Sequence, residues 1–249
     1  MLFKKRSINH VKVVQTINED MYISKVYRDI YAEFFKIGSD AVGKKSNILE
    51  IGGGDLSFAR DFWENVTITD ADETSQDESV LTSVAAENLP FKDEQFDVVI
   101  AKDALHHFKD PYLALNEIRR VLKNGGIFIV SEPYWSPLGR FIYRFIHPEP
   151  WSMNVKSLHR KSNDLWDSNQ ALLFLLTHKF KDNFVHEFPD FQINVLRPTY
   201  GISYMLSGGV HSRLPIPSTF LMFLYKYELK SKFLSKITGL NTLAVFHKS

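Results

Sequence analysis

A glycine turn directly after a short apolar run is the feature that most restricts how this chain can fold. The run ends at Ile51, and residues 52–54 are all glycine. Beyond the turn, apolar residues return at helical spacing, at Leu56, Phe58, Ala59 and Phe62. This order predicts a strand, a tight turn and a helix. Because glycine has no Cβ, the turn can adopt positive φ and leave room for a ligand above the strand end.

The residues after the glycines favour one class of nucleotide cofactor. A dinucleotide site reads Gly-x-Gly-x-x-Gly and holds a pyrophosphate on the helix N-terminus. Here Ser57 takes the last position of that pattern, and Asp55 lies where the anion would bind. A carboxylate suits the positive end of a helix dipole but repels a diphosphate, and the lysine of a Walker loop is missing. S-adenosylmethionine fits better, because it carries an ammonium and a sulfonium but no phosphate.

The turn also resembles the first motif of the class I S-adenosylmethionine-dependent methyltransferases. That motif reads acidic-hydrophobic-Gly-x-Gly-x-Gly. Glu50, Gly52 and Gly54 match it, and Leu56 replaces its third glycine. The resemblance assigns Glu50 and the glycines to the binding of S-adenosylmethionine.

Two further segments resemble the type 11 group of small-molecule methyltransferases within this family. Residues 89–100 begin Leu-Pro-Phe and resemble its second signature, and residues 116–126 resemble the helix and turn before its fifth strand. The resemblance covers roughly residues 45–133. It implies a Rossmann-like, doubly wound α/β sheet of seven strands, mostly parallel with an antiparallel last strand, and we expect a helical lid inserted after the core.

The remaining cofactor contacts are predicted at the ends of later strands. Asp70 ends the second strand, where a carboxylate can accept both ribose hydroxyls, and Asp72 either assists or caps the next turn. The family has an aspartate for the adenine amino group where this chain has Ala85, so backbone near Ala86 and Glu87 is expected to hold adenine. The full predicted cofactor-binding set is Glu50, Gly52, Gly53, Gly54, Asp70, Asp72, Ala86, Glu87 and Lys102.

Candidate catalytic residues follow two other strands. His106 and His107 come after a predicted strand at 96–100, and Glu132 ends one at 127–131. Adjacent histidines cannot both point into one cleft from a helix, so no metal site is predicted without partners at the proper spacing. One histidine is expected to pack structurally and the other to face the substrate as a candidate general base. Glu132 could steer a substrate amine or hydroxyl, or cap the following loop.

Helical and strand spacing divides the chain into parts of one methyltransferase domain. A helix at 21–37 has Asp20 as its N-cap and Gly38 as its stop, and the helix opened by Asp110 and Pro111 is expected to end at Gly125-Gly126. The parts that we predict are an N-terminal helical cap (1–40), a cofactor-binding core (45–133), a helical lid and substrate insertion (134–190), and C-terminal strands and a helix that complete the sheet (191–249).

The second half of the chain is rich in aromatic residues, and we expect it to bind the acceptor. A basic amphipathic helix at 138–146 could lie on a membrane surface, but we prefer a substrate lid because two arginines give little membrane affinity. Trp151 follows a proline-rich segment and can stack on a flat or sugar-like group. Strands are predicted at 191–195 and 243–246, a helix at 217–236, and a substrate-side loop at 207–213.

Composition limits the class of partner. A net charge of +1 argues against a nucleic-acid binder, and the absence of cysteine excludes disulfides, thiolate metal sites and cysteine nucleophiles. No apolar run reaches the roughly 20 residues of a membrane span, so we expect a cytoplasmic protein, with peripheral membrane contact left open.

These observations predict methyl transfer from S-adenosylmethionine to a small-molecule acceptor, by O- or N-methylation of a sugar or other polar metabolite. The reaction is an in-line displacement that needs a general base only if the nucleophile stays protonated at neutral pH. Two alternatives remain. One is an NAD-dependent oxidoreductase, disfavoured by Asp55 and Ser57. The other is a non-catalytic binding protein with a nucleotide fold, which the departures at Leu56 and Ala85 keep open.

Overall fold

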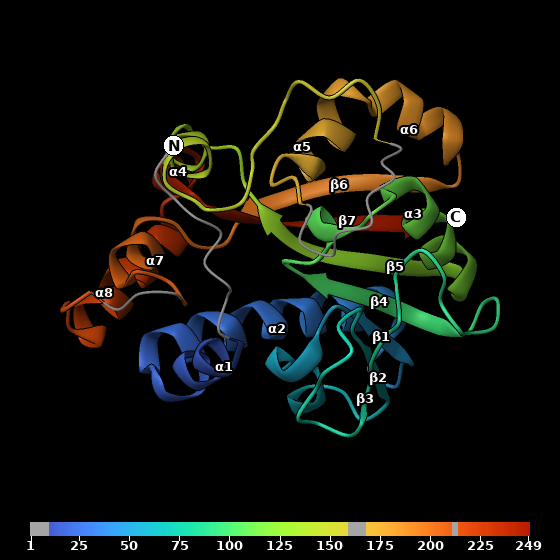
Figure 1. Ribbon diagram of the computed structural model, residues 1–249, viewed down its shortest axis with the longest axis horizontal. Coiled ribbons are helices and arrows are strands. Elements are labelled where there is room, and N and C mark those ends of the chain that lie inside the picture. Colours follow the sequence, from blue (N-terminus) through green and yellow to red (C-terminus); the bar gives the residue numbers. More distant parts are fainter. Residues whose placement is uncertain (1–9, 159–167, 211–213) are drawn as a thin grey trace.

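A single mixed sheet organises the computed structural model, which describes residues 10–158, 168–210 and 214–249 (Figure 1). Within these residues the sheet has seven strands in the order β3-β2-β1-β4-β5-β7-β6. All pairs from β3 to β5 are parallel, and β7 runs antiparallel to both β5 and β6. The strands are β1 (Ile48–Ile51), β2 (Val66–Thr69), β3 (Val80–Leu81), β4 (Phe96–Lys102), β5 (Leu122–Pro133), β6 (Phe191–Pro198) and β7 (Asn241–Lys248). The predicted α/β fold is therefore confirmed, including its antiparallel last strand.

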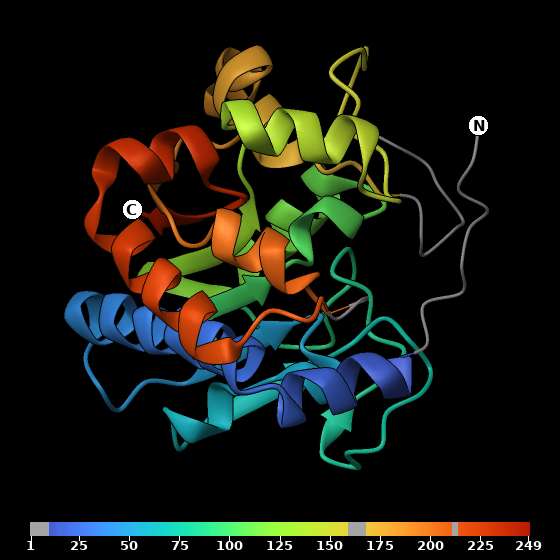
Figure 2. The same ribbon diagram turned by 90° about the vertical axis from the view of Figure 1, so that its left-hand side faces the viewer.

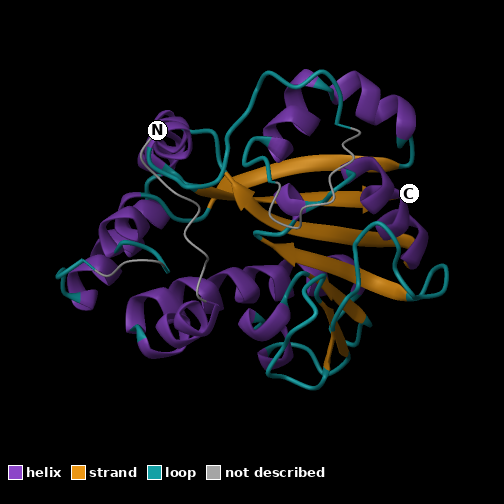
Figure 3. Cartoon of the chain, in the orientation of Figure 1, coloured by secondary structure: helices purple, strands orange, loops and turns teal. Residues whose placement is uncertain are grey.

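Helices cover both faces of the sheet (Figure 3). α2 lies on one face and α3, α5 and α6 lie on the other, while Figure 2 shows α4 and α7 around the edge toward which β4 and β5 point. The helices are α1 (His10–Glu19), α2 (Met21–Val42), α3 (Pro111–Val121), α4 (Pro137–Phe145), α5 (Leu172–Phe174), a π-helical segment (Leu175–Lys179), α6 (Lys181–Glu187), α7 (Ile202–Ser207), α8 (Ser218–Lys230) and α9 (Lys232–Thr238). Among the described residues, no helix combines the length and apolarity needed to cross a bilayer. Residues 211–213 of the predicted substrate-side loop lie outside the described residues.

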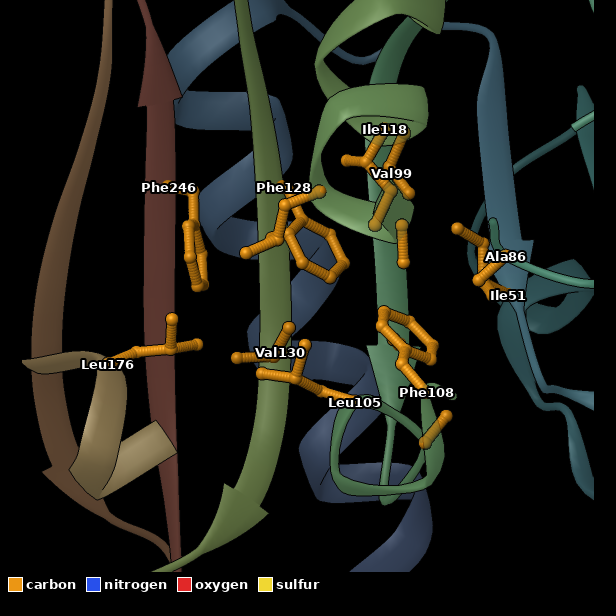
Figure 4. Close-up of a cluster of buried hydrophobic side chains, with 14 of the residues drawn as sticks. Ile51, Ala86, Val99, Leu105, Phe108, Ile118, Phe128, Val130, Leu176 and Phe246 are labelled. Atoms are coloured by element: carbon orange, nitrogen blue, oxygen red, sulfur yellow. The ribbon is translucent and has the colours of Figure 1, made fainter. Parts of the chain in front are cut away.

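Alternation along the strands divides the buried apolar residues into two clusters. In β4, Val99 belongs to the cluster that contains Ile118 of α3 and Phe246 of β7, as Figure 4 shows. The next residue, Ile100, belongs to the opposite cluster, together with Phe34 of α2. Successive side chains of a strand point to opposite faces, so a parallel sheet buried on both sides needs apolar residues at nearly every position.

α2 begins at the predicted residue and ends later than predicted. The Asp20 carboxylate accepts hydrogen bonds from the backbone N–H groups of Tyr22 and Ile23, at 2.9 and 3.0 Å, and so caps the helix. The prediction that Gly38 stops the helix is wrong, because the helix continues to its cap at Gly43, where φ is 92°. An added Cβ at Gly38 would lie 3.4 Å from Trp63 and Val98, so this glycine lets the helix pack closely on the sheet.

The segment after the glycine turn is not the predicted helix. It forms two 3-10 turns, at Gly54–Leu56 and Ala59–Asp61, and Ser57 between them has extended backbone (φ −73°, ψ 135°). The Ser57 hydroxyl donates to the buried Glu50 carboxylate and accepts a hydrogen bond from the Ala59 N–H at 3.1 Å. A serine side chain that bonds to nearby backbone competes with helix formation, which explains the difference.

Two other predicted boundaries also differ from the structure. α3 ends before Gly125-Gly126, contrary to prediction, because β5 begins at Leu122 and includes both glycines. The predicted helix at 217–236 is divided at Ser231, whose extended backbone (φ −95°, ψ 95°) ends α8 and whose side chain caps α9.

The cap of α2 gives a stability prediction. Replacing Asp20 with alanine should lower the free energy of unfolding by roughly 0.5–2 kcal/mol, because two backbone N–H groups lose their acceptor. Urea unfolding monitored by circular dichroism measures this loss. Asp40→Ala is the matched control: it removes an exposed carboxylate near the C-terminal end of the same helix, where negative charge is not favoured, and should cost nothing. Equal losses in the two variants would contradict the capping role.

Candidate active site

A cleft of about 230 Å³ opens at the carboxyl edge of β1, β2 and β4. This is where open α/β sheets bind ligands, at the point where the strand order reverses. The residues that line it are Ile51, Gly52, Asp70, Ala71, Asp72, Val84, Ala85, Ala86, Glu87, Asp103, Ala104, His107, Phe108 and Lys109.

Gly52 of the glycine turn lines this cleft, and only glycine fits there and at Gly54 behind it. Gly52 has a φ of 70°, and a Cβ there would lie 2.8 Å from the Cβ of Ala104. Gly54 has a φ of 46°, and a Cβ there would lie 2.7 Å from Oδ2 of Asp70. The turn therefore keeps side chains away from the β2 carboxylate and lets a ligand reach the backbone, an arrangement that fits a nucleoside cofactor.

Glu50 supports the turn from below. Its buried carboxylate accepts hydrogen bonds from the hydroxyls of Tyr31 on α2 and of Ser57 beyond the turn. A Cβ on Gly53 would lie 2.6 Å from Cδ of Glu50, so the carboxyl lies directly against the turn. Burial raises the pKa of Glu50 to about 7, although the hydrogen bonds from Ser57 and Tyr31 lower it.

The two acids after β2 differ in their surroundings. Asp72 accepts hydrogen bonds from the backbone N–H and the hydroxyl of Thr74, both at 3.0 Å, and so caps the next turn. Asp70 lies at the strand end, and its Oδ1 accepts from the Asp72 N–H at 2.9 Å. Both acids line the cleft. Asp55, in contrast, accepts from the backbone N–H groups of Gln76 and Asp77 at 3.0 and 3.2 Å, so it fixes the loop between β2 and β3.

The tip of β4 contributes a strained residue to the same cleft. Asp103 has a φ of 51°, which aspartate adopts more readily than most residues. Its Oδ1 accepts a hydrogen bond from Asn241 Nδ2 at 2.9 Å, and its Oδ2 pairs with Lys102. The Lys102 ammonium also lies 3.7 Å from the ring centroid of Tyr27 on α2.

A histidine and carboxylate cluster lies beside the cleft. His106 and His107 lie in a 3-10 turn (Leu105–His107), and their ring centroids are 4.4 Å apart. Nδ1 of the buried His106 lies 2.6 Å from Oε2 of Glu132, and its Nε2 lies 3.4 Å from Oε2 of Glu149. Nε2 of His107 lies 3.7 Å from the same Glu149 oxygen. The two histidines therefore converge on one carboxylate. The prediction that adjacent histidines cannot both point into one cleft applies to a helix, but these two lie in a 3-10 turn.

The two carboxylates determine the charge of His106. Burial alone would lower the pKa of this imidazole, but Glu132 and Glu149 outweigh burial and raise it to about 10. The pKa of Glu149 is lowered, because its interactions with His106 and His107 exceed the effect of its own burial. Without another cation, His106 is an imidazolium at neutral pH and has no lone pair to accept a proton.

Comparison with known proteins identifies the fold family. The sequence matches a methyltransferase domain over residues 49–130. The ubiquinone/menaquinone biosynthesis C-methyltransferase UbiE of Cupriavidus metallidurans is 33% identical over an alignment of 132 positions, which covers 45% of this chain and 54% of that protein. The demethylmenaquinone methyltransferase of Staphylococcus epidermidis is 31% identical over an alignment of 126 positions, which covers 48% of each chain. The chain spans about half the length, or less, of the curated relatives it matches.

A solved structure agrees with this match. The crystal structure of a methyltransferase dependent on S-adenosylmethionine from Archaeoglobus fulgidus gives a TM-score of 0.50 at 16% identity, covering 90% of this chain and 94% of that chain. The chain therefore carries a methyltransferase domain over residues 49–130, and its fold is that of a solved methyltransferase dependent on S-adenosylmethionine. The cofactor that these matches indicate is S-adenosylmethionine, which disfavours the NAD-dependent alternative.

The methyltransferase cleft brings together some of the predicted residues and leaves others outside. Those that line it are Gly52, Asp70, Asp72, Ala86, Glu87 and His107. Glu50 lies under the turn. Lys102 points to the face of the sheet that α2 covers, as Ile100 does two residues earlier, because successive residues of a strand point to opposite faces. The residues of the predicted set that do not line the cleft are Glu50, Gly53, Gly54, Lys102, His106 and Glu132.

Asp103, Glu149 and Asn241 are among the residues of the site that were not predicted. Asp103 had a local signal, since it directly follows the buried strand whose tip was already assigned to the cleft. Glu149 and Asn241 had no local signal. Glu149 is 42 residues away in sequence from His107, which it contacts, and Asn241 is more than 130 residues away from Asp103, to which it donates a hydrogen bond. Tertiary pairing of this kind leaves no periodic pattern in the sequence.

The raised pKa of Glu50 predicts a pH dependence of stability. The unfolded chain loses this proton near pH 4.5, whereas the folded protein keeps it up to about pH 7. The free energy of unfolding should therefore fall between these values, by on the order of 3 kcal/mol. Glu50→Gln should remove that fall, as urea unfolding across pH 4 to 8 would measure. Asp40→Asn, an exposed carboxylate, should keep the wild-type slope. Parallel curves for wild type and Glu50→Gln would contradict this assignment.

Proposed function

We propose that this protein transfers the methyl group of S-adenosylmethionine to an oxygen or nitrogen atom of a small polar acceptor. The observation that carries the proposal is the glycine-floored cleft with Asp70 at its rim. Methyl transfer from a sulfonium needs alignment and exclusion of water more than it needs a strong base. A site that binds the donor closely beside an acceptor pocket is therefore sufficient.

Each end of the cleft suits a part of the cofactor. Asp70 would accept hydrogen bonds from the ribose hydroxyls, and the backbone at Ala86 and Glu87 would hold adenine between apolar neighbours such as Phe108. The backbone of Gly52 would lie against the methionyl part. Asp103, whose carboxylate also pairs with Lys102, would lie near the ammonium group of the cofactor.

A second pocket supports a polar acceptor. It has a volume of about 470 Å³ and is lined by Arg140, Arg144, Trp151, Ser152, Met153, Asn154 and Phe174. The Trp151 ring stacks on Tyr143 with centroids 5.6 Å apart and an 8° angle between the planes. A rigid aromatic face beside two guanidinium groups suits a sugar-like or flat acceptor that carries negative charge. We assign residues 134–190 to the acceptor side of the enzyme.

The names of the relatives supply a second candidate acceptor. The matched proteins from Cupriavidus and Staphylococcus are named as quinone methyltransferases, and the first acts on carbon according to its name. The aromatic lining by Trp151 and Phe174 would also accept a flat quinol ring. The two arginines favour the charged, polar acceptor, because their positive charges at the pocket would attract an anion and would gain nothing from an uncharged quinol ring.

Cofactor binding tests the proposed role of Asp70. Asp70→Ala should weaken the binding of S-adenosylmethionine by roughly 1–3 kcal/mol, because two charge-assisted hydrogen bonds are lost. Isothermal titration calorimetry measures this change. Asp61→Ala removes another carboxylate of the same region, one that pairs with Arg28 outside the cleft, and should leave affinity unchanged. Wild-type affinity in Asp70→Ala would refute the placement of the ribose.

Methyl transfer itself separates an enzyme from a binding protein that only retains the fold. Protein incubated with methyl-labelled S-adenosylmethionine should label acceptors among sugar phosphates and other hydroxylated anions, with a demethylmenaquinol analogue tested in parallel. Trp151→Ala should raise KM for the acceptor about 2- to 10-fold through lost stacking, with cofactor affinity unchanged. Phe145→Ala, on the exposed side of α4, is the control. Transfer to the quinol alone would favour the second candidate, and transfer to none of these acceptors would refute the proposal.

A further inference from the structure

The convergence of two imidazoles on one carboxylate forms a ligand set that methyl transfer does not require. The nitrogen and oxygen atoms of His106, His107 and Glu149 lie within 4.8 Å of one another. We propose that these three residues bind a divalent transition-metal ion, with zinc as the best match, beside the cofactor cleft.

The distances between the ligand atoms suit a tetrahedral ion. Oε2 of Glu149 lies 3.4 Å from Nε2 of His106 and 3.7 Å from Nε2 of His107. Zinc binds nitrogen and carboxylate oxygen at about 2.0–2.2 Å, which places neighbouring ligand atoms roughly 3.3–3.5 Å apart. The ligand atoms of the two histidines lie within 4.8 Å of each other, so His107 and Glu149, whose side chains are partly exposed, would have to rotate inward to complete a tetrahedral set.

Outer contacts hold the ligands in the orientation that a metal needs. Nδ1 of His106 donates to Glu132, whose other oxygen accepts the Leu105 N–H at 2.8 Å. This leaves Nε2 of His106 directed at Glu149. Oε2 of Glu149, the oxygen that both histidines approach, also accepts hydrogen bonds from Gln170 and from the hydroxyl of Ser168 at 3.3 Å, so these bonds must shift to the other carboxylate oxygen when a metal binds. Histidine ligands of metals characteristically donate their second N–H to a carboxylate in this way.

The chemistry of the three ligands indicates the class of ion. Nε2 of His106 faces Glu149 at 3.4 Å, and the buried Glu132 contacts Nδ1 on the other side of the same ring at 2.6 Å. A divalent ion placed between the ligands would balance the charge of these carboxyl groups. Two imidazoles and one carboxylate favour zinc over magnesium or calcium, which prefer sets of oxygen ligands.

The position of the site indicates its use. Three protein ligands leave a fourth place on a tetrahedral ion, and the two partly exposed ligands place it near the cofactor, since His107 also lines the cleft. An ion there would lower the pKa of an acceptor hydroxyl, whose proton passes to water. The oxygen then bonds to the methyl carbon while the carbon–sulfur bond breaks and its electron pair stays on sulfur. This role rests on the proposed methyl transfer to oxygen, whereas metal binding does not.

Metal binding can be measured on the full-length protein without any acceptor. After treatment with a chelator and dialysis, the protein should bind one Zn²⁺ in competition with a chromogenic chelator, and Co²⁺ should give the visible absorption of a tetrahedral site. Glu149→Gln and His107→Ala should each weaken Zn²⁺ binding at least 100-fold, and Glu132→Gln, a positioning residue, should weaken it 10- to 100-fold. His186→Ala and Glu187→Gln, an exposed pair of the same residue types, should bind like wild type.

The outcomes separate this proposal from the proposed function. Wild-type protein that binds no Zn²⁺ or Co²⁺, or Glu149→Gln that binds as tightly as wild type, would overturn the metal site. Glu149→Gln keeps the shape of the side chain, and its thermal unfolding in chelator shows whether it is folded. If the metal binds as expected but no acceptor is methylated, the metal site stands and the proposed function fails.

Discussion

Parallel pairing of β1 with both β2 and β4 is the constraint from which the rest of this site follows. The connections that leave β1 and β4 run to opposite sides, so their loops part at the carboxyl edge and open a crevice. Gly52 and Ala104 face each other across its floor at a distance that excludes any Cβ on the glycine. The strand order thus fixes the place of the site, and the glycine turn determines how closely a ligand can approach.

A buried carboxyl then holds that turn in shape. Glu50 links α2, through Tyr31, to the segment after the turn, through Ser57. Burying an ionised carboxylate is costly, and the raised pKa of Glu50 is the consequence of that cost. The same hydrogen bond to Ser57 explains why a helix does not follow the turn. The cofactor motif is therefore maintained here by tertiary contacts, in place of the helix that its apolar spacing predicts.

Much of the fold could be predicted from the sequence because local patterns determine it. Buried strands, capped helices and acids at strand ends all leave periodic or positional signals, and these located Asp70 and the β4 tip. Which face a strand residue takes also follows from alternation, so the position of Lys102 against Tyr27 was predictable in principle. The partner of the two histidines was not. Glu149 lies in an irregular segment, and only the packed structure brings it to the 3-10 turn that carries them.

The histidine cluster links the two halves of the proposed reaction. His107 lines the cleft at the carboxyl edge of the sheet and also contacts Glu149, which lies two residues before Trp151 in the proposed acceptor pocket. Displacement at a methyl group requires the attacking atom and the methyl carbon within roughly 3–3.5 Å and in line with the bond that breaks. A movement of about 1 Å in the short segment from Glu149 to Trp151 would therefore change the acceptor pocket and the contact to the cofactor cleft together. Because His106 contacts Glu132 on one side and Glu149 on the other, these contacts oppose such a movement and, under the proposed function, would keep the acceptor in place relative to the donor.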